Sequence, residues 1–92
     1  MDDGEPISFL GRPALGGRVR VVVLPPADVL EYRCEQWADA LVVVERGTLE
    51  VECRGGARAR FRCGAMLAFA MVEPWRLHNP GDIPLVLSVL TR

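Results

Sequence analysis

The side chains of this sequence with the widest range of chemistry are its thiols and its imidazole, and the chain has few of them. The chain holds three cysteines, Cys34, Cys53 and Cys63, and one histidine, His78. The cysteines form no C-x-x-C pair, and their spacing with His78 matches no common zinc pattern. We therefore expect reduced thiols and neither a metal ion nor another cofactor, with His78 at the surface or in an interface.

Groups for nucleophilic or acid–base catalysis are also sparse. Cys34 is a candidate nucleophile, but its spacing places no histidine beside it, and buried thiols are usually inert. Glu35, Asp39 and Glu73 could act as acids or bases if desolvated, yet the alternating pattern favours solvent or loop positions for them. The catalytic residues are therefore unknown, and the sequence leaves open whether the protein is an enzyme.

The charged residues argue against nucleic acid or a membrane as a partner. Eleven basic and twelve acidic side chains give a formal net charge of -1, so there is no long-range attraction to polyanions. Arg54, Arg58, Arg60 and Arg62 form a stripe without interleaved aromatic residues, which indicates a solvated, ion-paired face. No apolar run approaches the roughly 20 residues of a membrane-spanning helix. The acidic start shows no signal-peptide pattern, so a cytoplasmic location is expected.

The sequence pattern predicts that these residues lie on short strands separated by turns. No window shows a sustained helical period, and short strands at near-regular spacing favour an all-β sandwich or barrel. The length of 92 residues predicts one domain, residues 1–92, with fraying expected at residues 1–6. The expected strands are residues 19–24, 29–37, 40–44, 48–53, 58–63, 66–70, 75–79 and 85–91.

The hairpin around Gly55 and Gly56 can be given a register from its side chains. A two-residue turn at these glycines would place arginines on the apolar face. A three-residue turn, residues 55–57, pairs Glu52 with Arg60 and Glu50 with Arg62, so opposite charges meet on one face. It also pairs Val51 with Phe61 and Cys53 with Ala59. We expect this second register, since three-residue hairpin loops with glycine are common.

From Ala38 onward, the strands and turns are arranged around Gly47 in ADALVVVERGTLEV and around Gly64 and Asn79 in GAMLAFAMVEPWRLHN. This order and spacing resemble the cupin superfamily. Gly47 matches the turn glycine of the family's first motif, and Gly64 and Asn79 stand at the ends of its second motif with the family's spacing. The span between the motifs is short, as in the smallest bacterial members. The resemblance covers about two thirds of the chain and implies a small, single-domain, jelly-roll-like β-barrel of antiparallel strands.

The resemblance also implies four metal-ligand positions, and this sequence departs from the family at each. The glutamate position holds Ala40, and the two histidine positions of the first motif hold Cys34 and Gln36. The histidine position of the second motif holds Trp75. A methyl group and an indole cannot ligate a cation, so the family's metal-dependent chemistry does not carry over.

Strand alternation predicts what lines the interior. Residues that share a parity should face inward from both motifs, and they are mostly apolar with a few polar points. Such a lining is typical of a small-molecule site, but also of a filled core. Both readings stay open, and Trp75 decides between them by stacking on a ligand or filling the barrel. The predicted ligand-binding residues are Cys34, Gln36, Ala40, Val42, Phe69, Trp75, Leu77 and Asn79.

Two functions are therefore expected as alternatives. In the first, the barrel binds a small hydrophobic molecule without metal, and shapes it for a non-redox cyclisation or isomerisation such as some small cupins perform in bacterial biosynthetic pathways. In the second, the protein is a non-catalytic module, a sensor or scaffold, with a filled barrel. A homodimer is expected in either case, because cupin dimers commonly pair barrel strands and a small chain exposes apolar surface.

Overall fold

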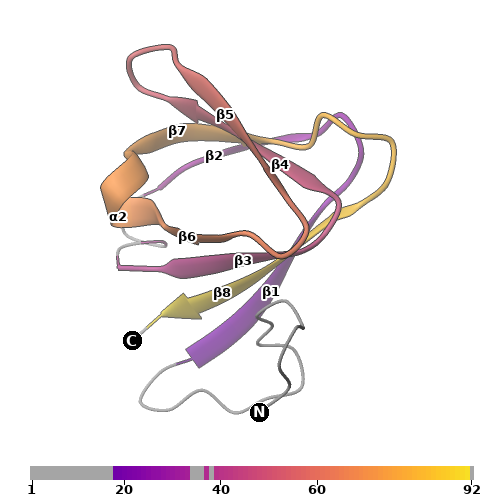
Figure 1. Cartoon of the computed structure of the whole chain (residues 1–92), viewed down its shortest axis with the longest axis horizontal. Coiled ribbons are helices and arrows are strands. Elements are labelled where there is room, and N and C mark those ends of the chain that lie inside the picture. Colours follow the sequence, from indigo (N-terminus) through magenta and orange to yellow (C-terminus); the bar gives the residue numbers. More distant parts are fainter. Residues whose placement is uncertain (1–17, 34–36, 38, 92) are drawn as a thin grey trace.

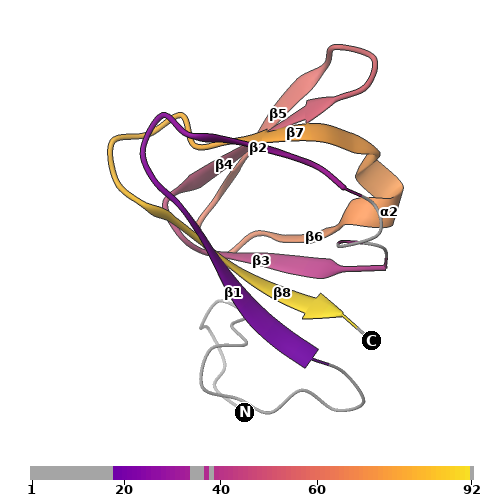
Figure 2. The ribbon, with the colours of Figure 1, turned by 180° about the vertical axis from the view of Figure 1, so that it is seen from behind.

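The computed structural model describes residues 18–33, 37 and 39–91. Within them the chain forms two four-stranded sheets that face each other, joined by short turns (Figures 1 and 2). In chain order the elements are β1 (Arg18–Leu24), β2 (Val29–Glu31), β3 (Leu41–Arg46), β4 (Thr48–Cys53), β5 (Arg58–Arg62), β6 (Met66–Ala68), α2 (Phe69–Val72), β7 (Pro74–His78) and β8 (Leu85–Thr91).

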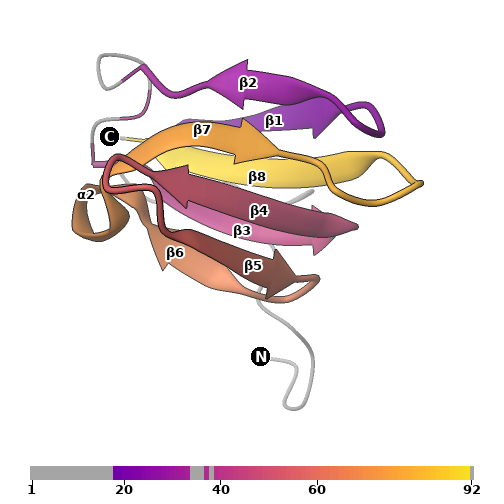
Figure 3. The same ribbon diagram turned by 90° about the horizontal axis from the view of Figure 1, so that it is seen from above.

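The sheets have the orders β1-β8-β3-β6 and β2-β7-β4-β5, and all their pairings are antiparallel. Consecutive strands often lie in different sheets, so the chain crosses repeatedly from one layer to the other, which Figure 3 shows from above. The expected all-β, jelly-roll-like architecture of antiparallel strands is confirmed.

The core lies between the two sheets and follows from alternation along the strands. On β4, Leu49 and Val51 point inward while Glu50 and Glu52 point outward, so the apolar side chains lose water and the charged ones keep a polar face. The buried cluster consists of Leu24, Trp37, Ala40, Val42, Val44, Leu49, Val51, Leu67, Phe69, Leu77, Leu85, Leu87 and Val89.

Two strands end at least two residues earlier than predicted. β2 stops at Glu31 rather than continuing to residue 37, and the backbone of Trp37 is helical. β6 stops at Ala68, and Phe69–Val72 form one helical turn that ends at Glu73 in the left-handed conformation, with φ 52°. The helical turn at Phe69–Val72 lies between β6 and β7, which belong to different sheets, so it carries the chain from one sheet to the other. A single turn has no sustained period, so the sequence pattern did not indicate it.

The β4–β5 hairpin has the predicted faces but a different register. Glu50 lies opposite Arg60 and Glu52 opposite Arg58, so the predicted pairs are wrong by two residues. The loop is residues 54–56, closed by a hydrogen bond from the Cys53 amide to the Ala57 carbonyl at 2.8 Å. Gly56 takes the positive φ of 91° that such a loop needs at its last position. A shift of two residues preserves alternation, so opposite charges still meet.

Gly47, the turn residue between β3 and β4, could not be another residue without strain. Its φ is 84°, and a Cβ there would lie 3.0 Å from the Pro84 carbonyl oxygen and 3.1 Å from Leu85 Cα. The glycine therefore lets the β3–β4 turn approach the start of β8.

Candidate functional site

Four of the predicted lining residues meet inside the barrel. Ala40, Val42, Phe69 and Leu77 are each at most 2% exposed and belong to one buried cluster. Their predicted inward orientation is confirmed, while no observation tests their predicted role as ligand contacts. Cys34 and Gln36, the polar points expected beside them, lie outside the described residues, as does Glu35.

Trp75 does not face inward, and its predicted orientation is wrong. The side chain is 40% exposed, and the Arg76 guanidinium lies 4.0 Å from the centre of its ring. The cause is an irregularity in β7: Arg76 pairs with Glu52 and Pro74 with the next residue, Cys53. Trp75 is therefore an extra residue between two pairs, as in a β-bulge, and strict alternation cannot be extended through it.

The buried indole belongs to Trp37 and not to Trp75. It is 1% exposed, and its ring centroid lies 5.3 Å from that of Phe69 and 6.4 Å from that of Tyr32. The rings of Tyr32 and Phe69 meet edge to face with centroids 5.8 Å apart, a favourable arrangement for aromatic pairs. Sequence reasoning missed this core because it extended a strand through residue 37, where the backbone is helical. The sequence signal that could have identified this core residue is a large apolar side chain three positions before Ala40, because tryptophan is usually largely buried.

The N–H edge and one face of the Trp37 ring have unusual surroundings. Its Nε1–H is buried and finds no hydrogen-bond partner in the part of the chain that the structure describes. Buried polar groups normally have partners, so an unpartnered one needs a physical explanation. The exposed Arg20 places its guanidinium 4.8 Å from the ring centre, within the range of a cation–π contact.

Asn79 is buried, but its side chain holds the fold together. Its Nδ2 donates to the carbonyls of Leu24 at 2.9 Å and Ile83 at 2.8 Å, and its Oδ1 accepts from the Gly81 amide at 3.0 Å. Its backbone amide also donates to the carbonyl of Asp28. These bonds tie the β1–β2 turn to the loop before β8. Since both amide hydrogens are engaged, the predicted use of Asn79 as a ligand contact gains no support.

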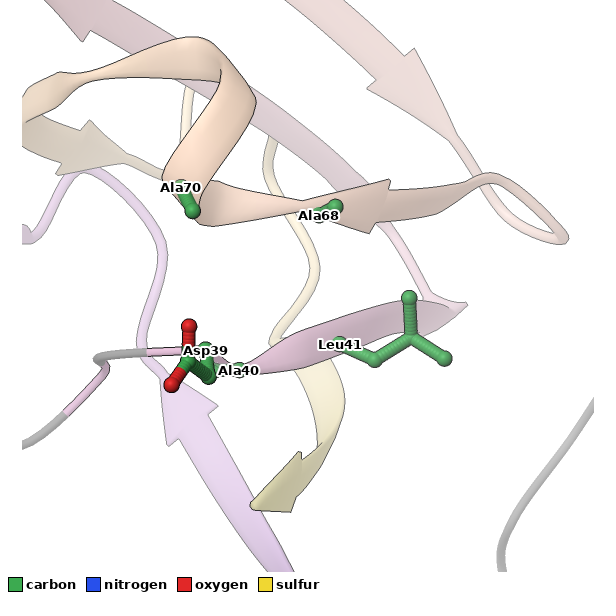
Figure 4. Close-up of a pocket in the computed structure, with 5 residues that line it drawn as sticks. All are labelled: Asp39, Ala40, Leu41, Ala68 and Ala70. Carbon is green, nitrogen blue, oxygen red and sulfur yellow. The ribbon is translucent and has the colours of Figure 1, made fainter. Parts of the chain in front are cut away.

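An open depression of about 240 Å³ lies at the end of the β3–β6 pair, where α2 begins (Figure 4). Its walls are three alanine residues, Leu41 and Asp39. Asp39 has a positive φ of 57° and is exposed, as expected from its place in the sequence pattern. The depression shares Ala40 with the buried cluster, but Trp37, Phe69 and Tyr32 are not among its lining residues.

Two nearly buried carboxylates organise the outward face of the second sheet. Arg60 Nε donates to Glu50 Oε1 and an Arg58 nitrogen donates to Glu50 Oε2, both at 2.9 Å. The hydrogen bond from Arg60, supported by that from Arg58, lowers the pKa of Glu50 against the opposing effect of desolvation. The predicted ion-paired arginine face is therefore present, with Arg58 and Arg60 as the paired residues.

His78 points outward, as predicted, and contacts Glu52 on this same face. The distance from His78 Nε2 to Glu52 Oε1 is 2.9 Å, and this hydrogen bond is the main cause of a lowered pKa at Glu52. An ionised carboxylate can only accept, so Nε2 carries the proton in this contact. Arg58 and Arg76 lie farther from the same carboxylate, at 3.7 and 3.9 Å. His78 is thus part of an ionic network and faces away from the barrel interior.

The two described cysteines are free thiols. Cys53 is half-buried and Cys63 is exposed, with its Sγ donating to the carbonyl of Glu45 at 3.2 Å. Among the described residues, no group of three histidine, cysteine or acidic side chains is arranged to hold a metal ion. No helix among them is long and apolar enough to cross a membrane.

Three solved structures that are similar to this chain are bacterial cupin domains or proteins. The cupin domain of an XRE family transcriptional regulator from Enterobacter cloacae has a TM-score of 0.65 and 22% identity, over 78% of this chain and 76% of that one. A cupin conserved-barrel protein from Salinispora arenicola has a TM-score of 0.65 and 15% identity, over 96% and 73%. A cupin domain from Bordetella pertussis has a TM-score of 0.56 and 18% identity, over 98% and 95%.

This chain has the cupin fold. The resemblance on its glycine and asparagine spacing is thereby confirmed for the architecture. No sequence model of a protein family matches the chain, and a comparison with curated proteins finds no match.

The family resemblance implies that Ala40 and Trp75 stand at two of the usual ligand positions. Ala40 is in the core at 2% exposure, and Trp75 lies on the surface. Neither side chain offers a donor atom for a cation. The remaining two positions, Cys34 and Gln36, lie outside the described residues. The described half of the usual ligand set therefore does not fit a cupin metal ion.

Proposed function

We propose that this cupin domain is a non-catalytic dimeric module, a sensor or scaffold, whose barrel is filled. The observation that carries the proposal is the packing of Trp37 against Phe69 and Tyr32 at one end of the core. An indole buried to 1% exposure occupies space that a ligand or a reacting group would otherwise take.

The alternative, a barrel chamber for cyclisation or isomerisation of a small hydrophobic molecule, has less support. It relied on Trp75 to stack on the substrate and on Gln36, which lies outside the described residues, as a hydrogen-bond donor, with Asn79 as a further polar point. Trp75 lies at the surface under Arg76, and Asn79 is fully used in binding backbone groups. The described interior residues are apolar apart from Asn79 and the aromatic edges, so they offer little to general acid–base chemistry.

The outward face of the β1-β8-β3-β6 sheet supports the dimer. Val21, Ser88, Val43 and Met66 form one row across its four strands. Val21 and Met66, at the two ends of the row, are 49% and 45% exposed, and Val23 on β1 is 56% exposed, whereas Val43 and Ser88 in the middle of the row are buried. A second copy would cover this apolar surface by the same face, which is the symmetric contact that most homodimers use.

A regulatory role has one further support from the comparisons. The similar structure from Enterobacter cloacae is a domain of a transcriptional regulator, so the fold serves there as part of a regulatory protein. For the present chain, a module of this kind would act through association rather than through turnover.

Sedimentation velocity across a range of protein concentrations tests the association. We expect a dimer that Val23→Glu weakens, because a charge would be buried in the contact. Val29→Glu is the matched control, since Val29 is 46% exposed but lies on the outward face of the opposite sheet. A wild-type protein that stays monomeric at high concentration, or an equal effect of both variants, would contradict the proposed dimer face.

A further inference from the structure

The depression at the end of the β3–β6 pair combines small apolar walls with one charged group. Its volume of about 240 Å³ is smaller than a typical drug-sized site, but it can hold a molecule of a few carbon atoms. Three of its five lining residues are alanines, Ala40, Ala68 and Ala70, and a fourth is Leu41. Their side chains leave the space open and bring no polar atom into it.

The carboxylate of Asp39 is the one charged group in this lining. It is exposed, and no hydrogen bond or ion pair engages it in the part of the chain that the structure describes. Glu50, by contrast, is held by two arginines. Figure 4 shows Asp39 on one side of the opening and Ala70 on the other. The negative charge is therefore available to a cation that enters the depression.

Backbone hydrogen bonds hold the two sides of the depression in place. The Ala40 amide donates to the Trp37 carbonyl at 2.8 Å, and the Phe69 amide donates to the Ala40 carbonyl at 3.2 Å. The second bond joins the segment before β3 to the start of α2. Asp39 has a positive φ of 57°, a conformation that aspartate and asparagine adopt more readily than most residues. The walls are thus formed before a ligand arrives, which lowers the ordering cost of binding.

We propose that this depression binds a small organic ammonium ion with a short apolar chain. The ammonium group pairs with the Asp39 carboxylate, and the chain lies against Leu41 and the alanine methyl groups. A metal cation is a poorer match, because a single carboxylate supplies few of the oxygen ligands that it needs. The inference goes beyond the proposed module role, since the ligand site is outside the filled core and needs no second copy of the chain.

Butylammonium is a suitable probe, because its amine is protonated at neutral pH, as a lysine side chain is. An exposed ion pair is partly screened, so we expect a dissociation constant on the order of 1 mM. Nuclear magnetic resonance of the ¹⁵N-labelled protein measures the binding. The backbone amide resonances of Leu41 and Ala70 should move in a saturable manner, while that of Ala59, on β5 of the other sheet, stays in place.

Two substitutions test the charge and the space separately. Asp39→Asn keeps the shape of the side chain and its tolerance of a positive φ, and should weaken binding by about fivefold or more. Ala70→Leu should abolish the saturable shift, because the larger side chain fills the depression. Ala70 is exposed on α2, so this change leaves the core intact. Asp82→Asn, at an exposed carboxylate in the loop between β7 and β8, is the matched control and should bind like the wild type.

Butanol, which has the same chain without the charge, should bind about fivefold or more weakly than butylammonium. The proposal is overturned if butylammonium causes no saturable shift at Leu41 and Ala70. It is also overturned if Asp39→Asn or Ala70→Leu binds as well as the wild type, or if butanol binds as tightly as butylammonium. A protein that dimerises but fails this test would retain the module without the ligand site. A monomer that passes it would retain the ligand site without the association.

Discussion

At the scale of single residues, the two tryptophans exchange the roles that the sequence assigns to them. Alternation along a strand predicts an inward Trp75, and the structure buries Trp37 instead. Both outcomes come from local backbone geometry: an extra residue in β7 turns Trp75 outward, and a helical conformation at residue 37 turns Trp37 inward. Residue type shows that a tryptophan prefers burial, but the backbone decides which one is buried.

Truncation of the two tryptophans should therefore have very different costs. Trp37→Ala should lower the free energy of unfolding by about 3–5 kcal/mol, because it leaves a large cavity beside Phe69. Trp75→Ala should cost at most about 1 kcal/mol, since its ring is 40% exposed and its cation–π contact with Arg76 is at the surface. Urea unfolding of both variants measures the difference. Equal losses, or a larger loss for Trp75→Ala, would contradict the assigned core.

Asn79 provides a second test at this scale. Asn79→Ala removes two donated bonds and one accepted bond, including the buried bond to the Leu24 carbonyl. We expect a loss of about 2–3 kcal/mol in the free energy of unfolding. Asp82→Ala, an exposed change in the same loop, should stay within about 0.5 kcal/mol. Thermal unfolding measures both variants. Equal stability of the two would contradict the structural role of the Asn79 side chain.

At the scale of the elements, the strands could be predicted from the sequence because alternation and turn residues act locally. β4 is predicted with its observed bounds, and β8 likewise. The β4–β5 register is wrong by two residues, because charge pairing fixes only which faces meet and the position of Gly56 in the loop decides the rest. The helical turn at Phe69–Val72 and the irregularity at Trp75 are set by how the chain must close the barrel, which no local pattern encodes.

The ionic face of the second sheet predicts a loss of stability in acid. The folded state lowers the pKa of Glu50 below its ordinary value of 4.5, chiefly through Arg60. The unfolded state therefore takes up the proton first, so this contribution is present above pH 4.5 and is lost as the pH falls through the folded pKa.

Glu50→Gln isolates this effect. The variant should show a smaller fall in the free energy of unfolding than the wild type between neutral pH and the acid side of the transition. Urea unfolding at a series of pH values measures the difference. Glu31→Gln is the control, because Glu31 is exposed on the same sheet. Parallel pH profiles for wild type and Glu50→Gln would show that the Arg60 contact contributes nothing.

At the scale of the whole molecule, the joint spacing of turn glycines and strands indicates the cupin fold where no single residue is specific. The fold can therefore persist while its ligand positions change, because Gly47 is required by the approach of Leu85 and Asn79 by the loops that it ties. Neither constraint involves a metal ion. Strand alternation could not predict which aromatic side chain lies inside the barrel, since that depends on the segments outside the strands at one end.

Purified protein should contain no stoichiometric transition metal when measured by elemental analysis. The physical reason is that a methyl group at residue 40 and a surface indole at residue 75 stand at two of the four usual ligand positions. One equivalent of iron, manganese, zinc or nickel that resists a chelator would contradict this expectation.

The filled barrel is tested most directly by the environment of Trp37. In Trp75→Phe, Trp37 is the only tryptophan, so its fluorescence reports the barrel interior alone. We predict emission at short wavelength and strong protection from quenching by acrylamide, as for an indole at 1% exposure. Emission typical of a hydrated indole, with efficient quenching in the folded protein, would show that Trp37 does not fill the barrel.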